Sequence, residues 1–265
     1  MLYQLMTLYR RRMRLLAGNP RELFVPLLTP VLFAVIIAPA LQKALGSFNP
    51  RVDYMTFVAI ATVALLVPLN SMFSGIGAMV DRLHGGLREL LAAPVPRWFV
   101  PLANVMATLT IAALQVGVLV GAAVLRGAVL HTSAGGVVWF AAAALLLAAA
   151  VAGIAEMMAF RLHSQEEYVG LVPAIAIVPW FFAGSLFPIT ALPSWLTDVA
   201  KALPWTHALA LMRYGLVGGP ASGLHAIWGW SSTAAMALAS LGVVTVFAAG
   251  LLTISMTVFR RSAVQ

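Results

Sequence analysis

The sequence of 265 residues contains no cysteine and very little charge. The lack of cysteine excludes disulfides, thiolate zinc sites, iron–sulfur clusters and a cysteine nucleophile. Only 9% of the residues are charged and 62% are hydrophobic, whereas soluble domains are about 25% charged and about 45–50% apolar. A soluble fold cannot hide this much apolar surface, since even a domain of about 300 residues buries only about 75% of it. The composition therefore excludes a soluble enzyme and a disordered chain.

Several chemical signatures are missing as well. No G-x-x-x-x-G-K-[ST] stretch is present, so the chain cannot cradle the phosphates of ATP itself. No H-E-x-x-H pattern occurs among the scattered histidines, which disfavours a metal centre. The sequence predicts no catalytic residue, no metal ligand and no cofactor in this chain. The histidines are His84, His131, His163, His207 and His225.

Six apolar runs without Asp, Glu, Lys or Arg reach the length of about 20 residues that a bilayer-spanning helix needs. Eleven of the 16 Lys and Arg residues fall on the side of both termini and five on the other. By the positive-inside rule, both termini are expected in the cytoplasm. The net charge of +8 then concerns topology and anionic lipid, not nucleic acid. The predicted spans are residues 23–42, 54–80, 98–125, 127–155, 168–197 and 234–258 of a single membrane domain, residues 1–265.

Glu156 directly follows the fourth apolar run, residues 127–155, and precedes the cytoplasmic loop that begins at Arg161. It lies about one turn from the cytoplasmic end of its span, where a long side chain can snorkel to the surface or pair with Arg161. We favour this structural role over a role in transport, because no buried series of carboxylates forms an ion relay. A transporter without a coupling ion or a nucleotide site takes its energy from another protein.

The N-terminal segment, residues 1–18, is predicted to be an amphipathic helix. Within residues 2–16, Leu5, Met6, Tyr9 and Met13 recur at spacings of three and four, so they share one helical face. The arginines Arg10, Arg11 and Arg14 fall on other faces. Such a basic amphipathic helix suits the cytoplasmic interface of a membrane.

The first cytoplasmic loop, residues 81–97, is rich in charge for this protein. A short helix is expected at residues 87–93, stopped by Pro94, with Arg88 and Glu89 on its polar face. Two interpretations remain open: this surface docks a partner, or the loop is a solvated hairpin between two spans.

Residues 192–219 are too polar for a span and too apolar for a free loop. Pro193 and Pro204 suit the first turns of two half-helices, predicted at residues 194–202 and 205–217. Broken segments at membrane depth are tolerated when they are buried in protein or line a wet cavity. We therefore expect an external gate, with Trp195 and Trp205 at the level of the lipid headgroups.

Three stretches carry a family resemblance. They are N-P-R-E-L at residues 19–23, L-R-E-L-L-A-A-P-V-P-R-W at residues 87–98, and a longer region. The longer region contains F-A-G-S-L-F-P-I at residues 182–189, L-P-S-W-L at residues 192–196, L-P-W-T-H-A at residues 203–208 and Met212-Arg213. With these motifs in order, the chain resembles the bacterial type-two ABC permeases, the membrane subunits of daunorubicin-resistance and nodulation-factor exporters.

The resemblance implies an all-α integral membrane fold like that of ABCG-type exporters. It has six transmembrane helices, an N-terminal elbow helix, a cytoplasmic coupling helix and external re-entrant half-helices before the last span. It implies a dimer with an identical or homologous permease in the bacterial inner membrane. It also implies a separate dimer of ABC ATPase subunits, which holds ATP and magnesium.

The resemblance also assigns roles to individual residues. The coupling helix matches residues 81–93, although Gly85 and Gly86 leave its start open. The second and fifth spans would line the substrate path, with ordinary span packing as the alternative for each residue. The coupling residues are Asp81, Arg82, Leu83, His84, Leu87, Arg88 and Glu89; the pathway residues are Asn70, Ser71, Phe73, Phe181 and Phe182; the external gate residues are Trp195, Trp205, His207 and Arg213.

The expected function is the permease half of an ATP-driven exporter of an amphipathic drug, lipid or glycolipid, with membrane lipid around it. Export of a polysaccharide or lipooligosaccharide is the alternative within the family. An ion-coupled transporter or a channel is the alternative outside it, which the scarcity of charge in the spans disfavours. An enzyme is disfavoured because catalytic constellations are missing from the sequence.

Overall fold

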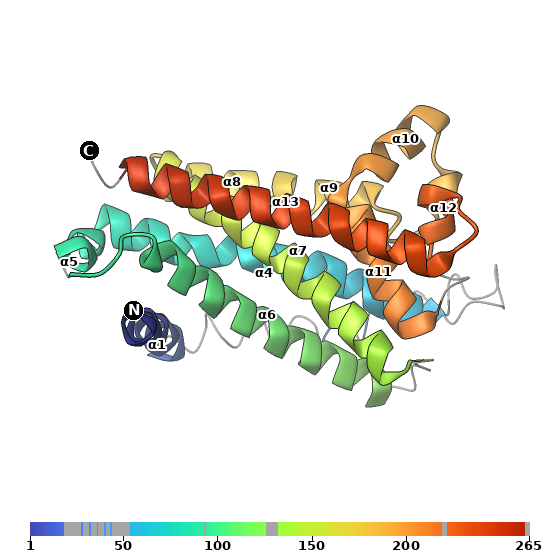
Figure 1. Ribbon diagram of the computed structural model, residues 1–265, viewed down its shortest axis with the longest axis horizontal. Coiled ribbons are helices and arrows are strands. Elements are labelled where there is room, and N and C mark those ends of the chain that lie inside the picture. The colour runs from blue at the N-terminus through green and yellow to red at the C-terminus, as the bar shows by residue number, and fades with distance from the viewer. Residues whose placement is uncertain are drawn as a thin grey trace.

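The computed structural model describes residues 1–18, 54–92, 94–125, 132–218 and 222–262, and the isolated positions 28, 32, 36, 40 and 43. Within these residues the regular structure is entirely helical, without any strand (Figure 1). The expected all-α class is therefore confirmed for the described chain. The predicted first span, residues 23–42, lies outside the described residues apart from those isolated positions.

Four described helices are long and apolar enough to cross a membrane. They agree with the second, third, fourth and sixth predicted spans. Each exceeds the roughly 20 residues that about 30 Å of hydrocarbon requires. The helices are α4 (Tyr54–Leu83), α6 (Phe99–Leu125), α7 (Ala134–Arg161) and α13 (Thr233–Ser262).

The predicted fifth span is not one continuous helix. It forms α8 (Gln165–Ala176), α9 (Val178–Phe182), a loop and the 3₁₀ turn η2 (Ile189–Ala191). Pro173 and Pro179 each remove a backbone donor, and Gly184 adopts a φ of 78° that ends the helical path. Together α8 and α9 cover residues 165–182, which is about 27 Å of helix. The six-span count therefore stays a prediction.

Apart from α8 and α9, which run alongside α13 in Figure 1, the short helices lie at the two ends of the long ones. In Figure 1, α1 (Leu2–Gly18) is seen almost along its axis beside the start of α6, so it runs across the long helices. Both termini and α5 (Gly86–Ala92) lie at this end. The predicted half-helices are confirmed as α10 (Ser194–Ala202) and α11 (Pro204–Val217), while α12 (Leu224–Trp228), between Gly223 and Gly229, was not expected.

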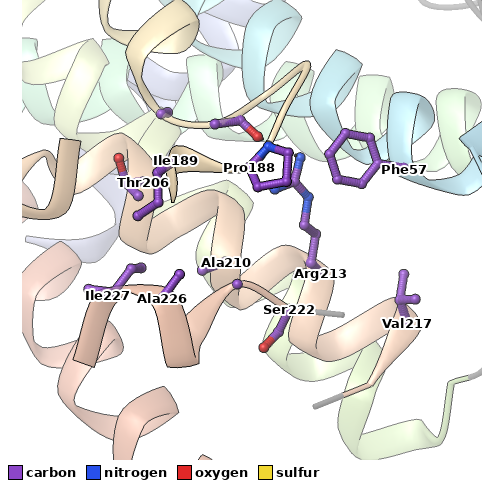
Figure 2. A pocket seen from close by; sticks show the side chains of 13 residues that line it. Phe57, Pro188, Ile189, Thr206, Ala210, Arg213, Val217, Ser222, Ala226 and Ile227 are labelled. Carbon is purple, nitrogen blue, oxygen red and sulfur yellow. Dashed lines mark hydrogen bonds between the residues drawn. The ribbon is translucent and has the colours of Figure 1, made fainter. Parts of the chain in front are cut away.

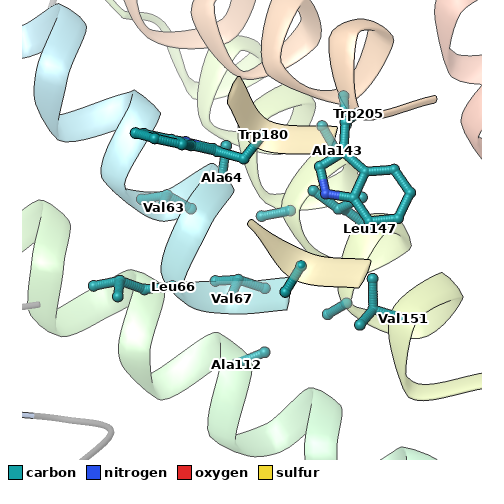
Figure 3. Close-up of a cluster of buried hydrophobic side chains, with 14 of the residues drawn as sticks. Val63, Ala64, Leu66, Val67, Ala112, Ala143, Leu147, Val151, Trp180 and Trp205 are labelled. Carbon is teal, nitrogen blue, oxygen red and sulfur yellow. The ribbon is translucent and has the colours of Figure 1, made fainter. Parts of the chain in front are cut away.

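Helix α7 is the centre of the bundle and packs against α4, α6, α11 and α13. Its residues from Ala143 to Ala152 are mostly alanines that are almost completely buried. Small side chains let neighbouring helix backbones approach closely, which favours association within a membrane. Figure 3 shows Leu147 and Val151 of α7 in the cluster that they form with Val67 of α4 and Trp205 of α11.

The tightest helix crossing joins α7 to α11. A Cβ atom on Gly215 would lie 2.4 Å from the carbonyl oxygen of Gly136, and a Cβ atom on Gly136 would lie 2.2 Å from that of Gly215. Both contacts are with backbone, which cannot move aside as a flexible side chain does. Glycine at these two positions is therefore a condition for the observed crossing.

We expect Gly215→Ala to destabilise the bundle by about 1–3 kcal/mol, because the new methyl group forces the two backbones apart. The matched control is Gly250→Ala on α13, where an added Cβ meets nothing within 4 Å and helix propensity improves by up to about 1 kcal/mol. Unfolding in mixed micelles measures both changes. Equal stability of the two variants would contradict the close crossing.

Candidate functional site

The short helix expected at residues 87–93 is confirmed, and it is shorter than the coupling helix that the resemblance implied. Helix α4 continues through Leu83, and Gly85 then reverses the chain at a φ of 85° before α5 begins at Gly86. The expectation of one coupling helix from residue 81 is therefore wrong. Residues 81–83 are the last turn of α4, and only Leu87, Arg88 and Glu89 of the coupling set lie on α5.

Helix α5 has two different sides. Leu87, Leu90 and Leu91 are partly buried and pack against the hydrophobic core. Arg88 and Glu89 are exposed, as are the adjacent Leu83 and His84. The ring of His84 donates from Nδ1 to the carbonyl oxygen of Val80 at 3.1 Å. The exposed side of α5 together with Leu83 and His84 forms a small polar surface, which we call the α5 surface.

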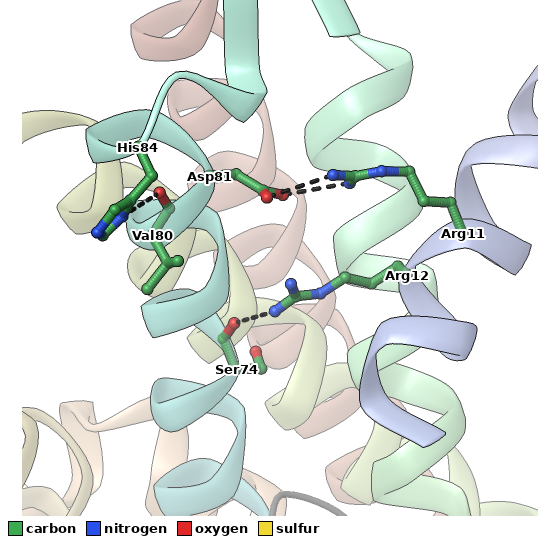
Figure 4. Close-up of polar contacts among 6 residues, drawn as sticks. All are labelled: Arg11, Arg12, Ser74, Val80, Asp81 and His84. Carbon is green, nitrogen blue, oxygen red and sulfur yellow. Dashed lines mark hydrogen bonds and ion pairs between the residues drawn. The ribbon is translucent and has the colours of Figure 1, made fainter. Parts of the chain in front are cut away.

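Asp81 and Arg82 do not belong to the α5 surface, because each binds another part of this chain. The two carboxylate oxygens of Asp81 accept from the guanidinium of Arg11 on α1 at 3.2 and 3.3 Å (Figure 4). Arg82 donates to the carbonyl oxygen of Leu162, in the loop between α7 and α8. These two residues therefore join α4 to its neighbours rather than present charge to a partner.

Arg12 forms a second connection between α1 and α4, and it is buried. Its guanidinium donates to the carbonyl oxygen of Ser74 at 3.0 Å, as Figure 4 shows. The group lies against Gly77, where any Cβ atom would collide with it. The sequence contained a signal for this position, since Arg12 is three residues after Tyr9 and four before Leu16 on the packed face of α1.

Glu156 is buried in α7, with 3% of its surface exposed. Arg12 acts on it electrostatically, and the side chain of Asn104 on α6 lies within hydrogen-bonding range. Its Oε2 atom has no hydrogen-bond partner among the described residues. The expectation that Glu156 reaches the surface or pairs with Arg161 is wrong, because the carboxyl faces inward while Arg161 is exposed.

We expect Arg12→Met to lower the free energy of unfolding by about 3 kcal/mol, since it removes the charged hydrogen bond to the carbonyl oxygen of Ser74 and the cation that acts electrostatically on Glu156. In a Glu156→Gln background the same change should cost about 1–2 kcal/mol less. The matched control is Arg11→Met, which breaks a partly exposed ion pair and should cost less than about 1 kcal/mol. The double-mutant cycle is measured by unfolding in mixed micelles. Equal costs of Arg12→Met in the two Glu156 backgrounds would contradict the coupling to Glu156.

The five predicted pathway residues are not brought together. Trp180 on α9 donates to the carbonyl oxygen of Ala61 at 2.8 Å, and Tyr168 on α8 donates to that of Met72 at 2.6 Å. Phe181 and Phe73 therefore lie about 12 residues of α4 apart, which is about 18 Å. Both phenylalanines are exposed, at 49% and 43%.

The remaining pathway candidates differ from one another in burial and bonding. Ser71 is buried and its hydroxyl donates back to the carbonyl oxygen of Val67 in the same helix, at 2.8 Å. Phe182 and Asn70 are half-buried, and the Asn70 amide nitrogen has no hydrogen-bond partner among the described residues. Packing within the helix explains Ser71 without a role in a substrate path.

At the opposite end, the predicted gate residues also separate by burial. Trp195 is 68% exposed, as expected for a residue at the headgroup level. Trp205 is only 4% exposed and makes an edge-to-face contact with Phe247 of α13. The expectation that Trp205 lies at the headgroup level is therefore wrong, because α11 turns this side chain into the core.

His207 joins four helices through one polar network. Its Nε2 lies 2.9 Å from the carbonyl oxygen of Lys201 on α10, and its Nδ1 lies 3.1 Å from the hydroxyl of Ser240 on α13. A carbonyl oxygen only accepts, so Nε2 carries the proton and Nδ1 accepts from Ser240. The same hydroxyl accepts from Trp228 of α12 at 2.9 Å. The network holds the half-helices on α13.

Arg213 is buried beside a cavity at this end (Figure 2). Its Nη2 donates to the carbonyl oxygens of Gly184 and Ser185 at 2.9 and 3.2 Å. Its guanidinium lies 3.8 Å from the ring centre of Phe57 on α4. Arg213 therefore fixes the loop after α9 to the first turns of α4, and its position agrees with a structural part of a gate.

The sequence profile of the ABC-2 type transporter family matches residues 3–217. The chain belongs to this family. It is 29% identical over 201 residues to the probable doxorubicin resistance ABC transporter permease protein DrrC of Mycobacterium tuberculosis, covering 72% of this chain and 68% of that protein. It is 24% identical over 198 residues to the putative transport permease ycf38 of Porphyra purpurea, covering 74% of this chain and 68% of the relative.

A further relative is the probable multidrug ABC transporter permease YbhR of Escherichia coli, 20% identical over 166 residues. That match covers 60% of this chain and 43% of YbhR. The family and the four long apolar helices make this chain a multi-pass membrane permease subunit of an ABC transporter. ABC-2 permeases in general work with an ABC ATPase. The α5 surface and the cavity at the opposite end are the two candidate functional regions of this chain.

Proposed function

We propose that the chain is the permease subunit of an ATP-driven exporter that moves an amphipathic drug, lipid or glycolipid out of the cytoplasm or the inner leaflet. A separate dimer of ATPase subunits supplies the energy and holds ATP and magnesium. A second permease, identical or homologous, completes the transporter in the bacterial inner membrane. Both termini, α1 and α5 lie on the cytoplasmic side in this arrangement.

The observation that carries the proposal is the α5 surface. Its three leucines are packed into the bundle while Arg88 and Glu89 are exposed, so the helix can receive a partner without rearranging. A neighbouring subunit that binds the exposed charged residues of such a helix can move the bundle through its packed apolar residues. We assign this surface to the ATPase.

Movement of α5 can be transmitted along α4 to the other end of the molecule. Helix α5 follows α4 at the Gly85 turn, and α4 is a 30-residue helix that reaches Phe57, stacked against Arg213 at the opposite end. Arg11 and Arg12 fix α1 to the same part of α4. Helix α4 and α1 therefore move together, and movement of α4 reaches the loop that Arg213 holds.

The cargo class rests on the relatives and on the surface of the helices. Two relatives are named for doxorubicin resistance and for multidrug transport. The exposed residues of α9 and α13 include Phe181, Leu238 and Val246, which give an amphipathic cargo an apolar route along the membrane. A long hydrophilic saccharide would instead require a wide polar channel.

We expect Arg88→Glu and Glu89→Lys to abolish most of the cargo-stimulated ATPase activity of the reconstituted transporter while leaving permease folding unchanged. Exposed charges outside special contacts usually change stability by less than about 0.5 kcal/mol, and reversing them opposes the partner's complementary charge. The matched control is Asp198→Lys on α10, an exposed charge at the opposite end, which should retain coupling. Loss of expression with either α5 variant, or full coupling in both, would contradict this assignment.

The exporter itself is tested by purifying the protein from native membranes in mild detergent. A stoichiometric ATPase subunit with vanadate-sensitive hydrolysis, and ATP-dependent uptake of cargo into inside-out vesicles, is the expected result. A permease that moves cargo in response to an ion gradient in the absence of ATP would overturn the proposal.

A further inference from the structure

The cavity beside Arg213 has a volume of about 260 Å³. Its walls come from four places: Phe57 of α4, the loop around Gly184 and Pro188, one face of α11, and the start of α12. On α11 the lining residues recur at spacings of three and four, so they form a single stripe. Figure 2 shows them around the cavity, and they are Thr206, Ala210, Arg213 and Val217.

The cavity is built by fixed contacts. Arg213 holds the Gly184 and Ser185 carbonyl groups, and the Ser185 hydroxyl donates to the carbonyl oxygen of Trp180 at 2.7 Å. Thr197 of α10 donates to the carbonyl oxygen of Ile189 at 3.0 Å. The loop wall is therefore fixed by hydrogen bonds to α9, α10 and α11.

Small residues keep the space open. Ala183, Gly184, Ala210, Gly223 and Ala226 all line it, so no long side chain fills its interior. Pro188 and Gly223 are also exposed at the protein surface, which gives a molecule from outside a way in. An apolar cavity of about 150 Å³ is already large enough to stay dry and to bind benzene, and this one is larger.

The lining indicates the chemistry of the occupant. Most of the walls are apolar, with a few hydroxyl and guanidinium groups among them, which is the usual composition of a small-molecule site. Thr206 is 3% exposed, and its hydroxyl has no hydrogen-bond partner among the described residues. A buried hydroxyl without a partner carries a desolvation cost. Threonine in a helix has two accessible χ1 rotamers, so this hydroxyl can turn towards a guest.

We propose that this cavity binds a small amphiphile with a compact apolar body, such as a short alkyl chain or one or two rings, and one oxygen that accepts a hydrogen bond from Thr206. The guest enters from the surrounding membrane past Pro188 and Gly223. The site belongs to the permease chain alone. It is separate from the predicted pathway residues on α4 and α9, and it does not depend on an ATPase.

The test is photolabelling of the purified permease in lipid nanodiscs with 3-azioctanol, an eight-carbon alcohol that carries a photoreactive diazirine. We expect labelled peptides from residues 183–189, from α11 and from α12, and competition by excess octanol. Ala226→Phe fills the cavity and should reduce this labelling about tenfold. Thr206→Val preserves shape but removes the hydroxyl, and should reduce it about fivefold, the effect of one hydrogen bond.

The matched control is Ala191→Phe on η2, an exposed position outside the cavity lining, which should label as the unmodified protein does. Val217→Trp is a second filling variant in case Ala226→Phe fails to fold, which a melting curve reveals. Undiminished labelling of these peptides in a folded filling variant would overturn the proposal, as would labelling confined to membrane-facing positions such as Val246. The assay contains no ATPase, so its failure leaves the exporter proposal intact, and the reverse also holds.

Discussion

Close packing against α7 is the constraint on which the positions of the other helices depend. A bilayer offers no water to pair backbone groups, so the chain must be helical there and helices must associate through packing and polar contacts. The buried alanines of α7 allow α4, α6, α11 and α13 to pack around it. The same helix carries Gly136 at its α11 crossing and the buried Glu156 near its other end.

Polar side chains join neighbouring elements at both ends of the bundle. At one end Arg11 and Arg12 fasten α1 to α4, and at the other His207 and Arg213 fasten the half-helices to α13 and to the loop after α9. Each polar group that lacks water must be paired or pay a desolvation cost. These pairings make the ends rigid, and α4 runs between them. In the proposed mechanism, movement of α5 would be transmitted along this one helix.

The local features that proline and glycine govern were predictable from the sequence. Pro193 and Pro204 marked the starts of α10 and α11, and Gly85 interrupted the chain before α5. The roles of individual residues were harder to predict where they depend on the direction in which the side chain points. Asp81 and Arg82 looked like docking residues but bind Arg11 and the Leu162 carbonyl, and Trp205 looked interfacial but packs in the core. Charge and aromaticity in a loop do not reveal which neighbour lies opposite.

The sequence by itself determined that the protein is helical, spans a membrane and holds no nucleotide-binding motif, because these follow from composition, run length and missing residue types. It also determined the family, through motifs in a fixed order. Only the tertiary structure decided that Arg12 lies near enough to Glu156 to act on it electrostatically, since the two residues are far apart in the chain. Likewise, the cavity at Thr206 exists because four separate segments meet without a large side chain between them. The residue spacing within any one segment does not predict which other segments it will contact.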